Sequence, residues 1–144
     1  MKGFTLVELL IVIAILVIML SMGVPTFKTI QPDLKLSGDI RDLTGDLRLA
    51  CRMSVTEQVS YGILFSEKKY DLVLFGENKE VLKILKTKKL NSGINFKSIT
   101  FTNNKVLFNS YGSVNEGGSV ILENSKQRIK TIQVSSAGFV KVEN

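Results

Sequence analysis

The amino-acid sequence predicts an α+β protein, in which a long N-terminal helix packs on an antiparallel β-sheet domain. Three observations favour this fold class. Residues 4–24 are an apolar run of 21 residues, residues 36–58 repeat apolar side chains every three or four positions, and residues 59–144 hold short β runs divided by turn residues. Helix first and strands afterwards is the order typical of an α+β fold.

Residues 4–24 are predicted to form a transmembrane helix with one acidic side chain. A helix of this length reaches about 30 Å, which matches the hydrocarbon core of a bilayer. Glu8 is its single ionisable residue, and a carboxylate there costs at least about 2.5 kcal/mol. A cleaved secretory signal has a shorter apolar run, and a plain anchor gives no reason for Glu8. We therefore expect Glu8 to find its partner on another chain; the alternative is that Glu8 snorkels to the headgroups of its own leaflet.

Residues 25–35 are predicted to form a kinked or locally unwound connector. Pro25 and Pro32 lie seven residues apart, just after Gly23. Each proline removes a backbone donor and disfavours helix at the preceding residue. A simple bend between the apolar segment and the domain is the alternative.

Residues 36–58 are predicted to form an amphipathic helix that packs on the sheet of its own chain. Its charged residues are expected to lie largely away from the apolar face. The apolar face comprises Leu36, Ile40, Leu43, Leu47, Ala50 and Ser54, and the charged set comprises Asp39, Arg41, Asp42, Asp46, Arg48 and Arg52.

Residues 59–144 are predicted to form the antiparallel β domain, with strand order left open. The expected strands are Val59–Phe65, Tyr70–Phe75, Val81–Lys86, Ile94–Phe101, Val106–Phe108, Ser119–Glu123, Arg128–Val134 and Phe139–Val142.

Composition excludes several kinds of catalytic and metal site. The chain has no histidine and a single cysteine, Cys51. A Cys/His zinc site, a Ser-His-Asp triad and an intramolecular disulfide are therefore ruled out. No phosphate loop appears either, so we predict neither an enzyme nor a cofactor. Cys51 lies among apolar residues and is interpreted as a buried small apolar side chain.

Basic residues predominate, with a net charge of +6. Residues 81–105 contain six lysines and no acid, and further cations follow near the C-terminus. Such clusters can bind nucleic-acid phosphates, but lysines on strands also prevent edge pairing, and we favour a solvated face. The candidate nucleic-acid patch comprises Lys83, Lys86, Lys88, Lys89, Lys126, Arg128, Lys130 and Lys141.

The N-terminal motif, Gly3-Phe4-Thr5-Leu6-Val7-Glu8-Leu9-Leu10 with Ala14 and Pro25, resembles the N-terminus of type IV pilins and type II secretion pseudopilins. The resemblance implies that residues 1–3 are a leader, that prepilin peptidase cuts after Gly3, and that Phe4 is then N-methylated. It also implies that Glu8 pairs with the terminal amine of a neighbouring subunit, that Pro25 marks the helix kink, and that the fold is a pilin fold.

The resemblance extends to location and partners. Lys2 before the apolar run puts the leader in the cytoplasm and the C-terminal domain outside it. We expect a single-pass protein of the inner (cytoplasmic) membrane that lies in lipid before assembly and then enters a pilus or pseudopilus. The expected partners are other pilin or pseudopilin subunits, prepilin peptidase and the inner-membrane assembly platform.

Residues 39–50 and 106–112, together with the last strands, are similar to GspH/FimT-type minor pilins and pseudopilins. This similarity implies a minor structural subunit of a type IV pilus or a type II secretion system. A DNA-binding minor pilin of a natural-transformation pilus and a major pilin are the alternatives. The sequence leaves open which machine the chain serves and whether it binds DNA.

Overall fold

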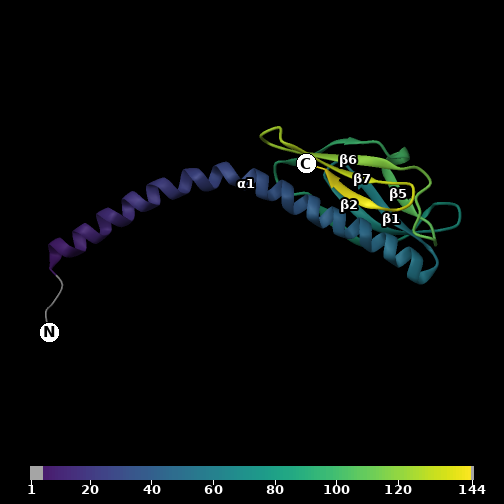
Figure 1. Cartoon of the computed structure of the whole chain (residues 1–144). Helices are drawn as coiled ribbons and strands as arrows, with labels where there is room; N and C mark the ends of the chain where they lie inside the picture. Colours follow the sequence, from purple (N-terminus) through teal and green to yellow (C-terminus); the bar gives the residue numbers. More distant parts are fainter. Residues whose placement is uncertain (1–4, 144) are drawn as a thin grey trace.

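The described residues form one long helix, the short 3-10 helix η1 (Thr102–Asn104) and eight strands (Figure 1). The computed structural model describes residues 5–143, and for residues 22–26 it describes the backbone alone. Helix α1 spans Leu6–Glu57. The strands are β1 (Ser60–Ser66), β2 (Lys69–Phe75), β3 (Val81–Lys89), β4 (Ile94–Ile99), β5 (Lys105–Phe108), β6 (Gly118–Asn124), β7 (Ile129–Val134) and β8 (Val140–Glu143).

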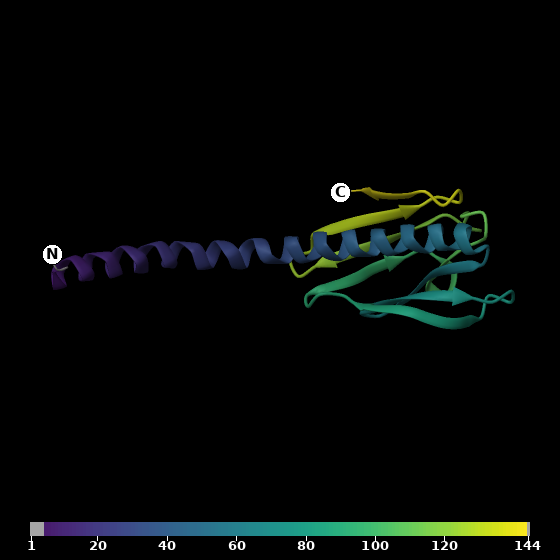
Figure 2. The ribbon, with the colours of Figure 1, turned by 90° about the horizontal axis from the view of Figure 1, so that it is seen from below.

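Helix α1 is continuous, which corrects the expected separate connector at 25–35. Each proline removes only one backbone donor, so a helix can bend there and continue. Pro25 and Pro32 are seven residues apart and therefore lie on the same side of a helix. The rod is visibly curved in Figure 1 and nearly straight after a quarter turn in Figure 2, so it curves in one plane. A specific kink at Pro25 stays a prediction.

The amphipathic half of α1 packs as predicted, because every member of its apolar stripe is buried. Leu43, Leu47 and Ala50 have no exposed surface. The helix ends at Glu57, and the backbone of the next residue, Gln58, is left-handed at φ 57° and turns the chain into β1. Expecting the charged residues to lie elsewhere was wrong at two positions, since Asp39 and Asp46 are buried too.

The strands form two antiparallel four-stranded sheets, in the orders β3-β2-β1-β5 and β4-β6-β7-β8. All eight predicted strands are present, with ends shifted by up to three residues. Helix α1 contacts strands of both sheets, and Figure 2 shows its C-terminal half crossing between them. The α+β fold, a long helix packed on antiparallel sheets, is therefore confirmed.

The hydrophobic core lies where α1 and the inner faces of the two sheets meet. Phe65 of β1 connects the sheets, because its ring lies 5.5 Å from that of Phe96 and 6.4 Å from that of Phe101. Of the described residues, none before Leu36 is buried. Residues 28–144 therefore contain every buried residue that the structure describes, and we expect them to fold without the preceding part of α1.

Candidate functional site

Residues 5–21, at the start of α1, form an apolar rod that is not packed on the described β domain. It extends away from the β domain (Figure 1). Residues 5–21 are all exposed, including Leu6 at 75% and Leu20 at 67%. Soluble proteins rarely expose a continuous apolar surface of this size, and such surfaces mark contacts with membranes or other proteins. We call residues 5–21 the assembly rod.

Glu8 lies in the first turn of this rod. The helix begins after Thr5, whose hydroxyl oxygen accepts a hydrogen bond of 3.2 Å from the Glu8 backbone N–H. Threonine at the cap and glutamate three residues later form the capping-box pattern, and an acidic side chain there also faces the positive end of the helix dipole. Among the described residues, no cation lies within ion-pair distance of the Glu8 carboxylate.

Two predicted functional residues, Gly3 and Phe4, lie outside the described residues. Cleavage after Gly3 and methylation of Phe4 therefore stay predictions, as does the pairing of Glu8. Within the part of the chain that the structure describes, no helix combines enough length and enough apolar character to cross a membrane.

The basic residues of the candidate nucleic-acid patch are divided between the two sheets. Lys83, Lys86, Lys88 and Lys89 lie on β3, at the edge of one sheet, whereas Lys130 and Lys141 lie on β7 and β8 of the other. Lys126 and Arg128 lie in the turn between β6 and β7. The structure therefore does not bring the eight side chains into one cluster.

Most of these cations also have partners in the chain. Ion pairs join Lys86 to Asp46 at 2.7 Å, Lys88 to Asp42 at 2.8 Å, Arg128 to Asp33 at 3.0 Å and Lys141 to Glu143 at 3.2 Å. Lys126 donates to the Thr29 carbonyl at 2.6 Å. A phosphate would have to compete with these partners, so the pairing favours a structural role for the lysines.

Sequence reasoning did not find the buried carboxylates that attach β3 to α1. Asp46 is 5% exposed and accepts hydrogen bonds from the Tyr70 hydroxyl at 2.8 Å and from Lys86. Burial, followed by the bond to Asp46, raises the pKa of Tyr70 well above its usual value. One feature of the sequence could have indicated their burial: Asp39 and Asp46 are seven residues apart, which places both beside the apolar stripe of the helix.

Asp39 attaches the loop after β3 in the same way. Its carboxylate accepts from the backbone N–H of Asn91 at 2.9 Å and from the Asn91 side chain at 2.7 Å. Burial raises the pKa of Asp39, although these hydrogen bonds and nearby Lys88 act in the opposite direction. Ion pairing with Lys88 lowers the pKa of the neighbouring Asp42. This carboxylate row fixes the edge strand β3 against the helix.

Cys51 packs against the core, as the sequence suggested, but it is only partly buried. Its Sγ lies 3.4 Å from the Gly112 carbonyl oxygen, and burial raises the pKa of the thiol. Among the described residues, no three Cys, Asp or Glu side chains are grouped to hold a metal ion.

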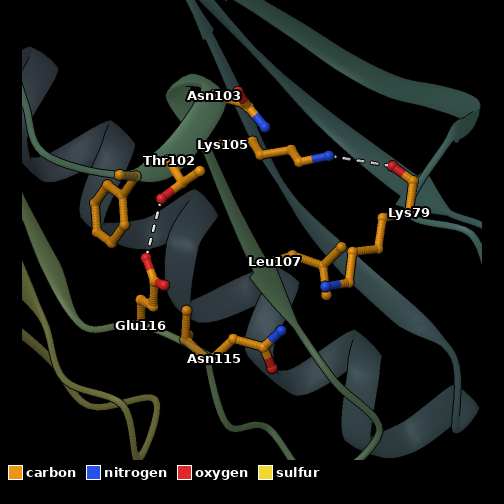
Figure 3. Close-up of a pocket in the computed structure, with 9 residues that line it drawn as sticks. Lys79, Thr102, Asn103, Lys105, Leu107, Asn115 and Glu116 are labelled. Atoms are coloured by element: carbon orange, nitrogen blue, oxygen red, sulfur yellow. Dashed lines mark hydrogen bonds between the residues drawn. The ribbon is translucent and has the colours of Figure 1, made fainter.

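A pocket of about 210 Å³ opens beside β5 (Figure 3). Its polar groups bond to one another, since Lys105 donates to the Lys79 carbonyl at 3.3 Å and Thr102 donates to the Glu116 carboxylate at 3.0 Å. Lys105 also lies 5.6 Å from the centre of the Phe75 ring. These groups already have partners, so the pocket does not by itself indicate a ligand.

Comparison with known proteins identifies both the motif and the fold. Residues 1–24 match the prokaryotic N-terminal methylation motif. No curated protein sequence matches the chain significantly. Solved structures do match: the type IV minor pilin FimU of Pseudomonas aeruginosa has a TM-score of 0.64 at 11% identity, over 83% of this chain and 93% of that one.

Two further structures have the same fold. The minor pseudopilin EpsH of the Vibrio cholerae type II secretion system gives a TM-score of 0.63 at 10% identity, over 76% of this chain and 96% of that one. Escherichia coli GspH gives 0.52 at 14% identity, over 70% of this chain and 82% of that one. The chain therefore carries the N-terminal methylation motif over residues 1–24 and shares the fold of these minor pilins and pseudopilins.

Proposed function

We propose that the chain is a minor structural subunit of a type IV pilus or a type II secretion pseudopilus. The observation that carries this proposal is the assembly rod, an exposed apolar helix with one carboxylate in its first turn, attached to a compact β domain. Prepilin peptidase cuts after Gly3, Phe4 becomes the methylated N-terminus, and the rod stays in the inner membrane until an assembly platform extracts it.

In the fibre, the rods of successive subunits replace lipid as the surroundings of the apolar side chains. Apolar contact is non-directional, so it holds the bundle together without setting how far one rod slides along the next. Glu8 sets this register, because its carboxylate pairs with the terminal amine at Phe4 of a neighbouring subunit. The hydrocarbon core of the bilayer holds no cation that could take this place.

The test is a set of Glu8 variants of the full chain, expressed in a host with a working pilus or secretion system. Glu8→Ala is expected to be cleaved and inserted normally but to enter sheared fibres at least about tenfold less than the wild type. An unpaired charge left by removing its partner costs about 3–5 kcal/mol when buried, which is more than enough for such a loss.

Two controls make the result specific. Thr5→Ala removes the cap and keeps the carboxylate, so it should reduce helix stability slightly and leave fibre entry close to normal. Glu8→Asp keeps the charge on a shorter side chain and should give intermediate entry. Normal incorporation of Glu8→Ala would exclude the pairing, and a wild-type chain that keeps residues 1–3 after insertion would exclude the leader assignment.

DNA binding is the alternative that the basic composition raised. Gel shift of residues 28–144 at several salt concentrations separates it from the structural role, because phosphate contacts weaken steeply with salt. Retardation at low salt that disappears with added salt would support DNA binding. We expect no retardation, since four of the eight candidate cations are paired with carboxylates.

A further inference from the structure

A groove runs between α1 and β8, on a side of the domain that the proposed function does not use. Its volume is about 390 Å³, and it is lined by Ser37, Ile40, Arg41, Thr44, Gly45, Arg48 and Val142. We call it the α1–β8 groove. It lies beside β8, which is the last strand of its sheet.

The first argument that the groove receives a ligand is an unpartnered hydroxyl. Thr44 is 6% exposed, and its Oγ1 is, among the described residues, the one buried side-chain polar atom without a hydrogen-bond partner. Buried polar atoms are nearly always hydrogen-bonded in native proteins. Thr44 lines the groove, so a molecule bound there is placed to supply the missing partner.

The second argument is the shape of the helix surface. At Gly45 an added Cβ would meet nothing within 4 Å. A glycine in the middle of a helix weakens it, so it requires a reason in packing or function. No described residue fills the space beside Gly45, and the lack of a side chain there lets another backbone approach α1 closely.

The third argument is the free edge of β8. The Val140 carbonyl accepts a hydrogen bond from Arg48 at 3.2 Å, so this backbone group points away from β7. Backbone groups alternate in direction along an antiparallel strand. Val142, two residues later, therefore also presents its backbone N–H and C=O to the free edge, where an added strand can pair with them.

The charge of the groove defines the chemistry of the occupant. Arg41 and Arg48 are the charged side chains that line it, both exposed, and no acid lines it. Arginine binds carboxylates through paired N–H donors. An apolar wall from Ile40 and an open strand edge suit a polypeptide better than a sugar-phosphate backbone, which has no amide groups to pair with β8.

We propose that the α1–β8 groove binds an extended segment of a neighbouring fibre subunit, which adds a strand to β8 and places an Asp or Glu side chain between Arg41 and Arg48. This inference rests on the proposed function, because it needs the chain to be incorporated into a fibre. It adds a second contact between subunits, in the β domain and far along α1 from Glu8.

Site-specific photo-crosslinking in the full chain tests the proposal. The photoreactive residue p-benzoylphenylalanine replaces Gly45 in one strain and Val12 of the assembly rod in another. We expect light-dependent adducts to a pilin or pseudopilin subunit from both positions. Mass spectrometry of the Gly45 adduct should place the crosslink within a few residues of an Asp or Glu.

A matched pair of charge reversals supplies the control. Arg41 lines the groove, whereas Arg52 lies on the same helix outside it and is also exposed, so we compare Arg41→Glu with Arg52→Glu. Arg41→Glu should reduce the Gly45 adduct at least fivefold, and Arg52→Glu should leave it unchanged. Both variants should keep the Val12 adduct and the thermal midpoint of the parent.

The outcomes separate the inference from the proposed function. A Val12 adduct without a Gly45 adduct would overturn the inference alone, and loss of both would overturn both. A Gly45 adduct that nuclease removes would assign the groove to DNA. A Gly45 adduct whose yield is unchanged in Arg41→Glu would exclude the carboxylate contact. Either of the last two results overturns the proposal as stated.

Discussion

Removing the carboxylate of Asp46 gives the sharpest test of how β3 is attached to the helix. Asp46 is 5% exposed and lies at the centre of a three-residue network. Its oxygens accept from the Tyr70 hydroxyl at 2.8 Å and from Lys86 at 2.7 and 2.8 Å. Asp46→Ala therefore removes the acceptor of a buried hydroxyl and the partner of a cation at once.

The two losses differ greatly in size. Tyr70 is 1% exposed, so its hydroxyl cannot reach water, and a buried donor left unpaired costs about 1–3 kcal/mol. The Lys86 side chain is 48% exposed and can turn to solvent, so its lost pairing costs about 0–1 kcal/mol. We expect Asp46→Ala to destabilise residues 28–144 by about 1–4 kcal/mol, the sum of the two losses.

Urea denaturation of residues 28–144 measures this change, and Asp42→Ala is the matched control. Asp42 also lies on α1 and also pairs with a lysine of β3, at 2.8 Å, but its side chain and that of Lys88 are each 37% exposed. Its removal should cost about 0–1 kcal/mol. Equal losses for the two variants would refute the assignment of the cost to burial.

A double-mutant cycle then identifies the hydroxyl as the cause. In a Tyr70→Phe background, residue 70 has no hydroxyl that could lose its acceptor. Asp46→Ala should therefore cost about 1–2 kcal/mol less there than in the wild type. Strict additivity of Asp46→Ala and Tyr70→Phe would mean that Tyr70 and Asp46 do not interact, which would contradict the network.

Three further predictions use the same fragment. Burial raises the pKa of Tyr70, so above about pH 10 the unfolded chain loses the hydroxyl proton while the native chain keeps it. The unfolding free energy of the wild type should therefore fall by about 1.4 kcal/mol per pH unit above pH 10, relative to Tyr70→Phe. Urea titration at several pH values measures this difference. Gly62→Ala should destabilise by about 3 kcal/mol in the same assay, because the added Cβ would lie 1.9 Å from the backbone oxygen of Val106. Thr44→Val should raise the thermal midpoint, with a gain of roughly 1 kcal/mol, because it removes an unpartnered buried hydroxyl; a loss of stability would show that the hydroxyl has a partner.

The sequence predicts those features of the fold that depend on neighbouring residues. A helix repeats every 3.6 residues, so Leu36 to Ser54 could be assigned to one buried face from spacing alone. Hairpins such as β6–β7 are similarly local, because a short turn joins two β runs. The pairing of β1 with β5 is not local, since β2, β3 and β4 intervene. No short-range pattern specifies that pairing.

The burial of Asp39 and Asp46 could not be predicted for the same reason. Their partners, Asn91, Tyr70 and Lys86, are 24 to 52 residues away in the sequence. Charged residues are rarely buried unless they are paired, so the helix sequence by itself predicts that Asp39 and Asp46 lie in solvent. Burial of the two carboxylates is favourable only once β3 packs beside α1, and that packing is part of the tertiary structure.

The two halves of α1 need different surroundings to cover their apolar surfaces. The half that begins at Leu36 is apolar on one side, and one side is what the sheets of the same chain can cover. The assembly rod is apolar all round, so its surroundings must be apolar on every side, as lipid or a bundle of like helices would be. Lipid alone leaves the carboxylate of Glu8 without a cation. A bundle of processed subunits would provide both apolar contact and a terminal amine, which is why we propose assembly with other chains and not anchoring alone.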